Sequence, residues 1–132
     1  MSLQGKTIVI TGAAGGLGRE VCRVAKEQGA EIIQVDIAFP EDADGQTLSF
    51  DLTDAEAVNN AMSGLGRIDG LINVAGGFDM GPTVYESTDD DWNKMFAINV
   101  KTARNMISAV VPKMLEQKLS LIHISEPTRQ IV

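Results

Sequence analysis

The residues that could do chemistry begin with a glycine-rich turn near the N-terminus, Thr11-Gly12-Ala13-Ala14-Gly15-Gly16-Leu17-Gly18. Gly12 permits a tight turn, Gly16 lets a pyrophosphate approach the backbone, and Gly18 lets a following helix pack closely on a sheet. The free N–H groups at the start of that helix would face the phosphates. The turn therefore predicts a dinucleotide site, with Thr11, Gly12, Gly16, Leu17 and Gly18 as candidate contacts. The alternative, a connector that binds nothing, is disfavoured by the strand before it and the helix after it.

An acidic residue, Asp36, ends an apolar run about twenty positions beyond the turn, where a carboxylate can accept hydrogen bonds from the adenosine ribose. The same charge would repel a 2′-phosphate, and the neighbouring Ile37 and Ala38 provide no arginine to bind one. Asp36 therefore favours NAD over NADP. Its alternative role is that of an ordinary exposed carboxylate at a strand end.

A further candidate is the triplet Asp51-Leu52-Thr53, which follows the next predicted strand and so lies beside the same cleft. A carboxylate there can accept a hydrogen bond from an adenine amino group. The competing role is structural, because Thr53 and Asp54 stand where a helix begins. The triplet alone does not decide between the two.

The chain alternates between strand-like and helical patterns, which supply the scaffold for these candidates. Apolar runs at 7–10, 31–36, 47–50 and 68–74 predict four buried strands. Helical spacing predicts helices that end at Gly29, begin at Asp54, and begin at Thr88 or Asp89. The alternation predicts an α/β fold, a Rossmann-type doubly wound parallel sheet truncated after about the fourth strand. The last helix carries Pro112, which favours a kink, and one apolar face: Trp92, Met95, Phe96, Val100, Ala103, Met106, Ile107 and Val110.

The composition narrows the class of protein. The 132 residues carry 11 basic and 18 acidic side chains, a net charge of -7, which argues against a nucleic-acid or anionic-membrane surface. A single cysteine, Cys22, excludes a disulfide framework and a cysteine-rich metal site. Neither a signal peptide nor a membrane-spanning run is visible in the sequence. We expect a cytoplasmic protein without a metal.

Four motifs in this order resemble the short-chain dehydrogenase/reductase family of the classical type, over Lys6 to about Lys118. The glycine turn looks like the family's cofactor turn, and Asp51-Leu52 like its adenine-contacting pair. Asn73-Val74-Ala75-Gly76 is similar to its Asn-Asn-Ala-Gly motif, with valine for the second asparagine, which leaves the backbone turn intact. The resemblance implies that Asn73, Ala75 and Gly76 belong to the cofactor site.

The fourth motif is Asn99, which resembles the helix asparagine of the family's Asn-Ser-Tyr-Lys tetrad, whose backbone holds a water in a proton relay. The resemblance implies hydride transfer between a nicotinamide cofactor and a small alcohol or carbonyl compound. In that chemistry a tyrosine gives or takes the hydroxyl proton, a lysine lowers the pKa of the tyrosine, and a serine orients the substrate oxygen. It also implies a homo-oligomer for the full-length enzyme, in which the long helix from Asp89 commonly packs against another subunit.

The family's Tyr-x-x-x-Lys pair is absent from the sequence. The only tyrosine, Tyr85, is followed four positions later by Asp89, and we interpret it as a loop residue. Ser125 stands about where the catalytic serine belongs, after an apolar segment that contains His123. However, Leu119 through Arg129 resembles the in-frame translation of a transposase-type sequencing adapter. We therefore expect a cofactor-binding portion at 1–118, a non-native tail at 119–132, and no activity from this chain.

Truncation has a structural consequence, because it would leave the fourth strand with an unpaired edge. The pattern of Leu121–Ile124 is compatible with a strand that pairs there. Two other functions remain open: a non-catalytic NAD-binding or sensory module, and a different Rossmann-type enzyme such as a methyltransferase. The spacing of Gly12 and Gly16, with Asn73-x-Ala75-Gly76 downstream, disfavours the methyltransferase.

Overall fold

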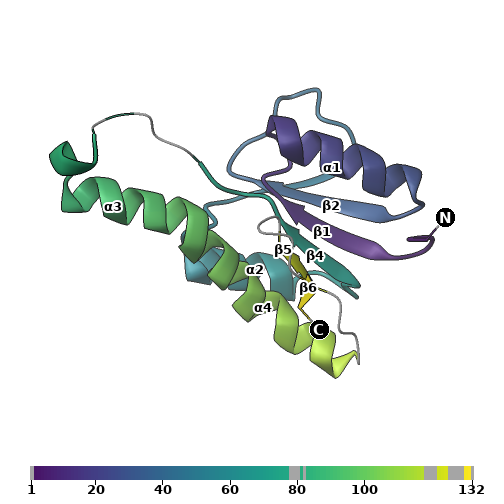
Figure 1. Ribbon diagram of the computed structural model, residues 1–132. Helices are drawn as coiled ribbons and strands as arrows, with labels where there is room; N and C mark the ends of the chain where they lie inside the picture. The colour runs from purple at the N-terminus through teal and green to yellow at the C-terminus, as the bar shows by residue number, and fades with distance from the viewer. Residues whose placement is uncertain (1, 78–80, 82, 118–121, 125–129, 132) are drawn as a thin grey trace.

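The computed structural model describes residues 2–77, 81, 83–117, 122–124 and 130–131. Within these residues one sheet has the strand order β3-β2-β1-β4-β5-β6 (Figure 1). The strands are β1 (Thr7–Thr11), β2 (Glu31–Asp36), β3 (Gln46–Ser49), β4 (Gly70–Asn73), β5 (Ile122–Ile124) and β6 (Gln130–Ile131). The first five are parallel, and β6 runs antiparallel to β5. The four predicted strands and the Rossmann-type fold are confirmed.

The fourth strand is shorter than the predicted 68–74, because side chains take over the backbone groups at its two ends. Ile68 pairs with the side-chain amide of Gln117, which accepts from the Ile68 N–H at 3.3 Å and donates to its carbonyl at 2.9 Å. At the other end, the N–H of Val74 donates to the Thr11 hydroxyl at 3.1 Å. Beyond the predicted four strands, β5 pairs with β4 over Ile122–Ile124, as the pattern of that segment indicated.

Three helix boundaries agree with the predicted signals at Gly29, Asp54 and Thr88. The helical elements are α1 (Gly16–Glu27), α2 (Ala55–Ser63), a short 3₁₀ turn η1 (Val84–Glu86), α3 (Asp89–Phe96), a π-helical turn η2 (Ala97–Lys101) and α4 (Thr102–Glu116). Gly29, with φ +93°, follows α1, and the Asp54 side chain caps α2. Thr88 caps α3 in a capping box with Asp91. Pro112 lies inside α4, which continues past it.

The sheet lies between two helical layers. On one face α1 covers a cluster that includes Ile8, Ile10 and Ala25. On the other face α2 and α4 enclose the larger cluster: Val9, Ile33, Val35, Leu52, Val58, Met62, Ile68, Leu71, Met106, Val110 and Met114. The ammonium group of Lys113 in α4 donates to the carbonyls of Met62, at the end of α2, and of Leu65, just beyond it. These bonds join the two helices of this layer. These layers hold the carboxyl ends of the strands in place.

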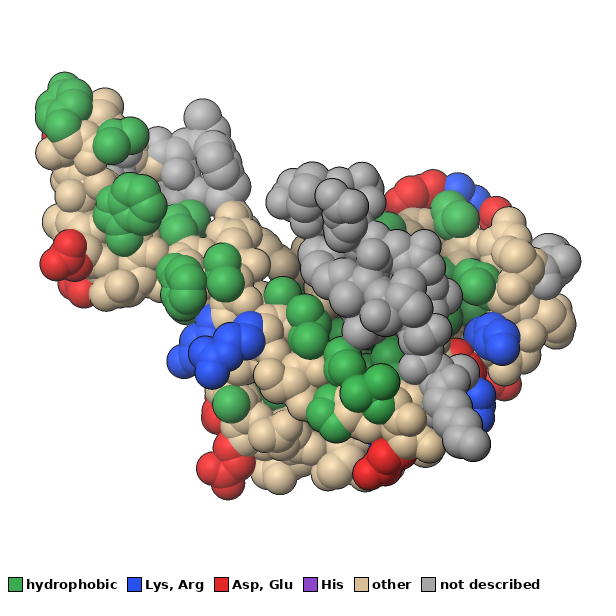
Figure 2. Space-filling model, turned by 60° about the horizontal axis from the view of Figure 1, so that its bottom comes forward, with side chains coloured by type: hydrophobic (Ala, Val, Ile, Leu, Met, Phe, Trp, Pro, Cys, Tyr) green, Lys and Arg blue, Asp and Glu red, His purple; other side chains and the backbone are tan. Residues whose placement is uncertain are grey.

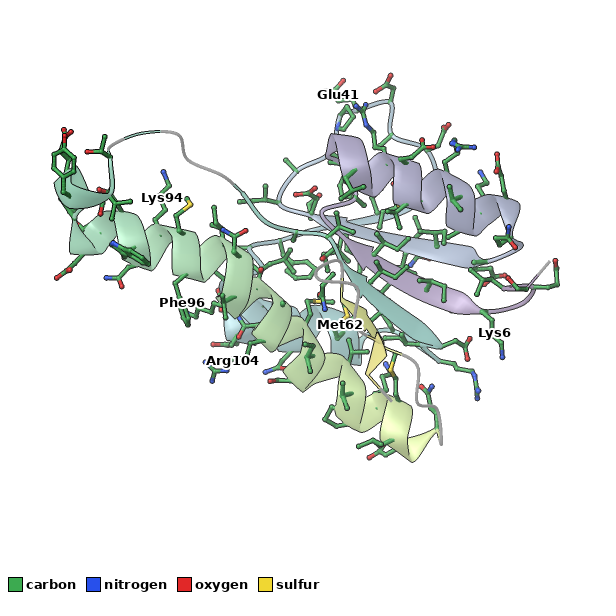
Figure 3. All side chains as sticks on the ribbon, in the orientation of Figure 1. Lys6, Glu41, Met62, Lys94, Phe96 and Arg104 are labelled. Atoms are coloured by element: carbon green, nitrogen blue, oxygen red, sulfur yellow. The ribbon has the colours of Figure 1, made fainter. Side chains whose placement is uncertain are left out.

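The apolar face of the long helix is buried in only one half. Met106 and Val110 of α4 are fully buried, whereas Trp92 and Phe96 of α3 are 65% and 57% exposed and Val100 of η2 is 48% exposed. Figure 2 shows hydrophobic side chains gathered on the arm that α3 and η1 form beside the body of the protein. Figure 3 contrasts Phe96, on this arm, with Met62 in the core.

Candidate cofactor site

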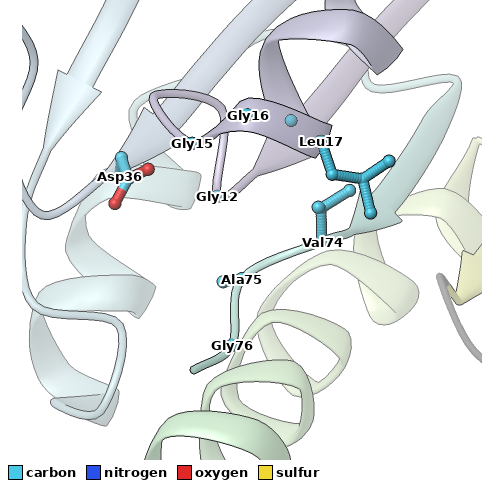
Figure 4. A pocket seen from close by; sticks show the side chains of 9 residues that line it. Gly12, Gly15, Gly16, Leu17, Asp36, Val74, Ala75 and Gly76 are labelled. Carbon is cyan, nitrogen blue, oxygen red and sulfur yellow. The ribbon is translucent and has the colours of Figure 1, made fainter. Parts of the chain in front are cut away.

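A cavity of about 270 Å³ opens at the carboxyl ends of β1, β2 and β4, which the glycine turn, Asp36 and the loop after β4 surround (Figure 4). Strands β2 and β4 lie on opposite sides of β1, so the cavity occupies the point where the strand order reverses, the usual ligand crevice of such sheets. Its lining residues are Gly12, Gly15, Gly16, Leu17, Gly18, Asp36, Val74, Ala75 and Gly76.

Seven of the predicted site residues line this cavity, and two of its lining residues were not predicted. The predicted seven are Gly12, Gly16, Leu17, Gly18, Asp36, Ala75 and Gly76. Gly15 lies within the glycine turn, and Val74 lies within the motif Asn73-Val74-Ala75-Gly76. Their places inside these two motifs were the signal that could have identified them. Leu17 and Val74 present apolar side chains to the cavity from α1 and from the loop after β4 (Figure 4).

Three glycines of the turn, Gly12, Gly16 and Gly18, differ in the space that a side chain would find. Gly12 has φ +67°, and a Cβ there would lie 2.7 Å from the backbone nitrogen of Ala75, so both conformation and space exclude a side chain. A Cβ at Gly18 would collide with the carbonyl oxygen of Gly12. Gly16 differs, because a Cβ there would meet no described atom within 4 Å. Gly12 and Gly18 therefore shape the turn, and Gly16 leaves open space above it.

The start of α1 can receive an anion. The helix begins at Gly16, and within the described residues no side chain caps it and no acidic residue lies in its first turn. Its first N–H groups lack helical acceptors and carry the positive end of the dipole. Beside the open space at Gly16, these groups fit the pyrophosphate of a dinucleotide.

Asp36 is held at the turn by two backbone donors. Its Oδ2 accepts from the N–H of Ala14 at 2.9 Å, and its Oδ1 accepts from the N–H of Ile37 at 2.7 Å. Each carboxylate oxygen can accept a further hydrogen bond. The side chain therefore lines the cavity in a fixed position with acceptor capacity to spare.

Thr11 has a supporting position behind the cavity wall. The residue is 1% exposed, and its hydroxyl oxygen accepts from the N–H groups of Val74 and Ala75, both at 3.1 Å. This places the loop after β4 directly against the end of β1. Thr11 does not line the cavity, so its geometry points to shaping the site.

Asp51 and Leu52 lie beyond the cavity lining, at the end of the segment after β3. Asp51 Oδ1 accepts from the Thr53 N–H at 2.9 Å and from its hydroxyl at 2.7 Å. These bonds, together with the charge of Lys101, lower the pKa of Asp51. Leu52 is buried, and its carbonyl accepts from Asn105 at 3.0 Å. The carboxylate is thus ionised at neutral pH, and the adenine contact stays a prediction.

Asn99 reaches the loop after β4 with its side chain. Its Oδ1 accepts from the Gly77 N–H at 3.1 Å, and its Nδ2 donates to the Gly77 carbonyl and to the Met95 carbonyl, both at 3.0 Å. A Cβ at Gly76 would lie 2.7 Å from Asn99 Oδ1. The side chain therefore holds the backbone adjacent to the cavity lining.

Asn73 lies at the end of β4, 4% exposed, and among the residues that the structure describes neither its Nδ2 nor its Oδ1 has a hydrogen-bond partner. Tyr85 is 88% exposed on η1, in agreement with its interpretation as a loop residue. Ser125 lies outside the described residues.

In the described part of the chain, no cluster of three metal-ligating side chains occurs, and no helix has the length and apolar character to cross a membrane.

The fold and this cavity define a Rossmann-type nucleotide-binding protein, and comparison with known proteins gives its family. The chain matches the family described as short chain dehydrogenase over residues 6–125. It is 34% identical over 125 residues to the short chain dehydrogenase adrF of Penicillium rubens, covering 88% of this chain and 49% of that protein. It is 37% identical over 122 residues to dehydrogenase/reductase SDR family member 6 of Rattus norvegicus, covering 88% and 49%.

Among solved structures, carveol dehydrogenase from Mycobacterium avium in complex with NAD superposes with a TM-score of 0.80 at 26% identity, covering 92% of this chain and 54% of that one. The chain belongs to the short-chain dehydrogenase/reductase family. It spans about half the length of the curated relatives that it matches.

Proposed function

We propose that this chain is the cofactor-binding portion of an oxidoreductase that interconverts an alcohol and a carbonyl compound by hydride transfer, with NAD favoured as cofactor. The observation that carries the proposal is the cavity itself, in which a glycine turn, a fixed carboxylate and the loop after β4 converge. Membership of the family and the NAD complex of the similar carveol dehydrogenase support it.

Each lining group has a distinct part in this proposal. The N–H groups at the start of α1 bind the pyrophosphate, and the Asp36 carboxylate accepts hydrogen bonds from the adenosine ribose. Asp51 accepts from the adenine amino group. When bound, NAD supplies the atom that gives or takes the hydride, and the chain orients it. Asp36 disfavours NADP, because a 2′-phosphate would lie against its carboxylate and Ile37 offers no cation.

The substrate of the full-length enzyme is a small alcohol or carbonyl compound, and the enzyme is a homo-oligomer. The exposed apolar side chains of Trp92, Phe96 and Val100 support the oligomer, because a single chain leaves them facing water. Sedimentation of this chain and of Phe96→Asp tests the contact; an unchanged sedimentation coefficient at every concentration would contradict it.

We also propose that 119–132 is a non-native tail and that the chain as it stands performs no hydride transfer. The sole tyrosine of the chain is Tyr85, and Asp89 stands four positions later, where the family places a lysine. Tyr85 also lies on η1 and is not among the residues that line the cavity. Without a proton donor activated by a lysine, the hydroxyl proton has no route.

The deciding experiment separates binding from turnover. Purified chain is titrated with NAD and with NADP, followed by the backbone amide resonances of the glycine turn. We expect shifts at Gly16 and Gly18 with NAD, weaker shifts with NADP, and no change in NADH absorbance with a panel of alcohols. Shifts only at residues distant from the cavity would contradict the proposed site, and equal responses to both nucleotides would contradict the preference for NAD. Oxidation of an alcohol with formation of NADH would contradict the proposed inactivity.

A further inference from the structure

The long helix from α3 to α4 is interrupted by the π-helical turn η2. At its end the N–H of Thr102 donates to the carbonyl of Ala97, five residues earlier, where an α-helix would use Ile98, four residues earlier. A π turn of this kind leaves neighbouring carbonyl groups without their usual helical donor, and such turns often mark functional sites. The partners of those carbonyls therefore decide whether the turn is stable.

Two side chains satisfy the carbonyls at this turn. The hydroxyl of Thr102 donates to the Ile98 carbonyl at 3.0 Å, and Nδ2 of Asn99 donates to the Met95 carbonyl at 3.0 Å. Thr102 is only 6% exposed, so water has little access to replace its hydroxyl. A threonine bonded four residues back in this way favours a bent helix. The Thr102 hydroxyl thus gives the Ile98 carbonyl the hydrogen bond that the Thr102 N–H would give it in a regular α-helix.

The turn controls where Asn99 points. Each residue of an α-helix rotates its side chain by about 100° around the axis. α4 is fixed on the sheet through Met106 and Val110, so conversion of η2 to regular α-helix would rotate Asn99 relative to that fixed part. The two bonds from Asn99 to the Gly77 backbone depend on its present direction.

We propose that Thr102 is a positioning residue of the cofactor site: its hydroxyl holds the π turn that directs Asn99 at Gly77, and thereby fixes the adjoining wall Val74–Gly76. The link to the nucleotide rests on the proposed function of the cavity. The link from Thr102 to Gly77 needs no nucleotide and can be measured alone.

The test compares two substitutions at Thr102 with a matched control. Thr102→Val keeps the shape and removes the hydroxyl, and Thr102→Ser keeps the hydroxyl. Ser63→Ala is the control: it removes an exposed hydroxyl bond within a helix away from the site, from Ser63 to the Asn60 carbonyl three residues back in α2. Amide hydrogen exchange at Gly77 is the readout. We expect protection to fall about fivefold in Thr102→Val and to stay unchanged in the other two. Wild-type protection in Thr102→Val overturns the proposal.

A measurement on the unsubstituted chain covers the case in which Thr102→Val does not fold. Scalar coupling across hydrogen bonds reports which carbonyl the Thr102 N–H contacts. Coupling to Ala97 supports the π turn in solution, and coupling to Ile98 overturns the proposal.

Titration of the same samples with NAD tests the part of the proposal that links Thr102 to the cofactor site. We expect the dissociation constant to rise about fivefold in Thr102→Val and to recover in Thr102→Ser. Lost Gly77 protection with unchanged NAD affinity would overturn the role in the cofactor site. Absence of NAD binding by the unsubstituted chain would instead contradict the proposed function, and the exchange data would still decide the role of Thr102 toward Gly77.

Discussion

The hydroxyl of Thr11 accepts a hydrogen bond of 3.1 Å from the backbone N–H of Ala75, 64 residues further along the chain. The same oxygen accepts from the N–H of Val74, so one buried atom serves two donors of the loop after β4. This contact joins the strand that precedes the glycine turn to the opposite wall of the cavity. The shape of the cavity therefore depends on a residue that does not line it.

Replacing Thr11 with valine should destabilise the fold, because the half-buried N–H groups of Val74 and Ala75 would lose their acceptor. We expect the free energy of unfolding to fall by about 2–4 kcal/mol, measured by urea denaturation with circular dichroism. Thr11→Ser retains the oxygen and should recover most of this loss. Equal stability of Thr11→Val and the unsubstituted chain would show that water satisfies the two donors.

Replacement by alanine should affect the stability of the fold differently at Gly16 and at Gly18. Gly18→Ala places a Cβ against the Gly12 carbonyl, so we expect a loss of stability of about 2 kcal/mol or more, or failure to fold. Gly16→Ala meets open space and should leave stability unchanged or slightly higher. Thermal unfolding of both variants, with NAD titration of Gly16→Ala, checks the pair.

In Gly16→Ala the methyl group would occupy the approach to the start of α1, so the affinity for NAD should fall while the fold persists. A variant that bound NAD as tightly as the unsubstituted chain would place the phosphates elsewhere.

The acid sensitivity of the fold should depend on Asp69, whose carboxylate accepts from the Thr7 N–H at 2.8 Å and pairs with Arg67 at 2.8 Å. Burial alone would raise the pKa of Asp69, but these two partners outweigh it and hold the pKa below its usual 3.8. Because the folded-state pKa is the lower one, the carboxylate stabilises the fold above about pH 4, and this contribution is lost as the pH falls through the folded-state pKa.

Asp69→Asn should therefore be less stable than the unsubstituted chain at about pH 6, and the difference should shrink toward about pH 2. Urea denaturation across this range measures it, with Asp42→Asn, an exposed loop residue, as the control of equal charge change. A constant difference between Asp69→Asn and the unsubstituted chain at every pH would assign the stabilisation to packing.

The cofactor preference should depend on Asp36. Asp36→Ala removes the proposed ribose acceptor and the charge expected to repel a 2′-phosphate, so the ratio of NADP to NAD dissociation constants should fall by about tenfold or more. Asp42→Ala is the control, because it loses the same charge outside the cavity. Nucleotide titrations of both variants separate the effect of the ribose contact from the effect of the changed net charge. The ribose role is wrong if both variants keep the original ratio.

Much of this architecture follows from local signals in the sequence. Asp54 and Thr88 start helices because their side-chain oxygens accept from free N–H groups, and Gly29 ends one because it adopts a positive φ. The turn η2 could not be predicted, because the apolar pair Phe96 and Val100 keeps its helical spacing across it. Such a turn is set by hydrogen bonds that no periodicity records.

The site shows the same division. The motif glycines and Asp36 were predicted because their chemistry requires those residue types at that spacing. The side-chain contact of Asn99 with Gly77 was not predicted, since it joins residues 22 positions apart through a loop without a repeating pattern. Likewise, Gly15 and Val74 line the cavity through the path of the backbone, which residue type alone does not reveal.

Two side-chain amides, that of Asn99 in η2 and that of Gln117 just after α4, hold the two ends of the segment that contains β4. Asn99 binds Gly77 and Gln117 binds Ile68, each through a paired donor and acceptor. The helical stretch between the two amides and the segment between the two bound residues must therefore match in length. An insertion or deletion of a single residue within either of them would put one of the two contacts out of register.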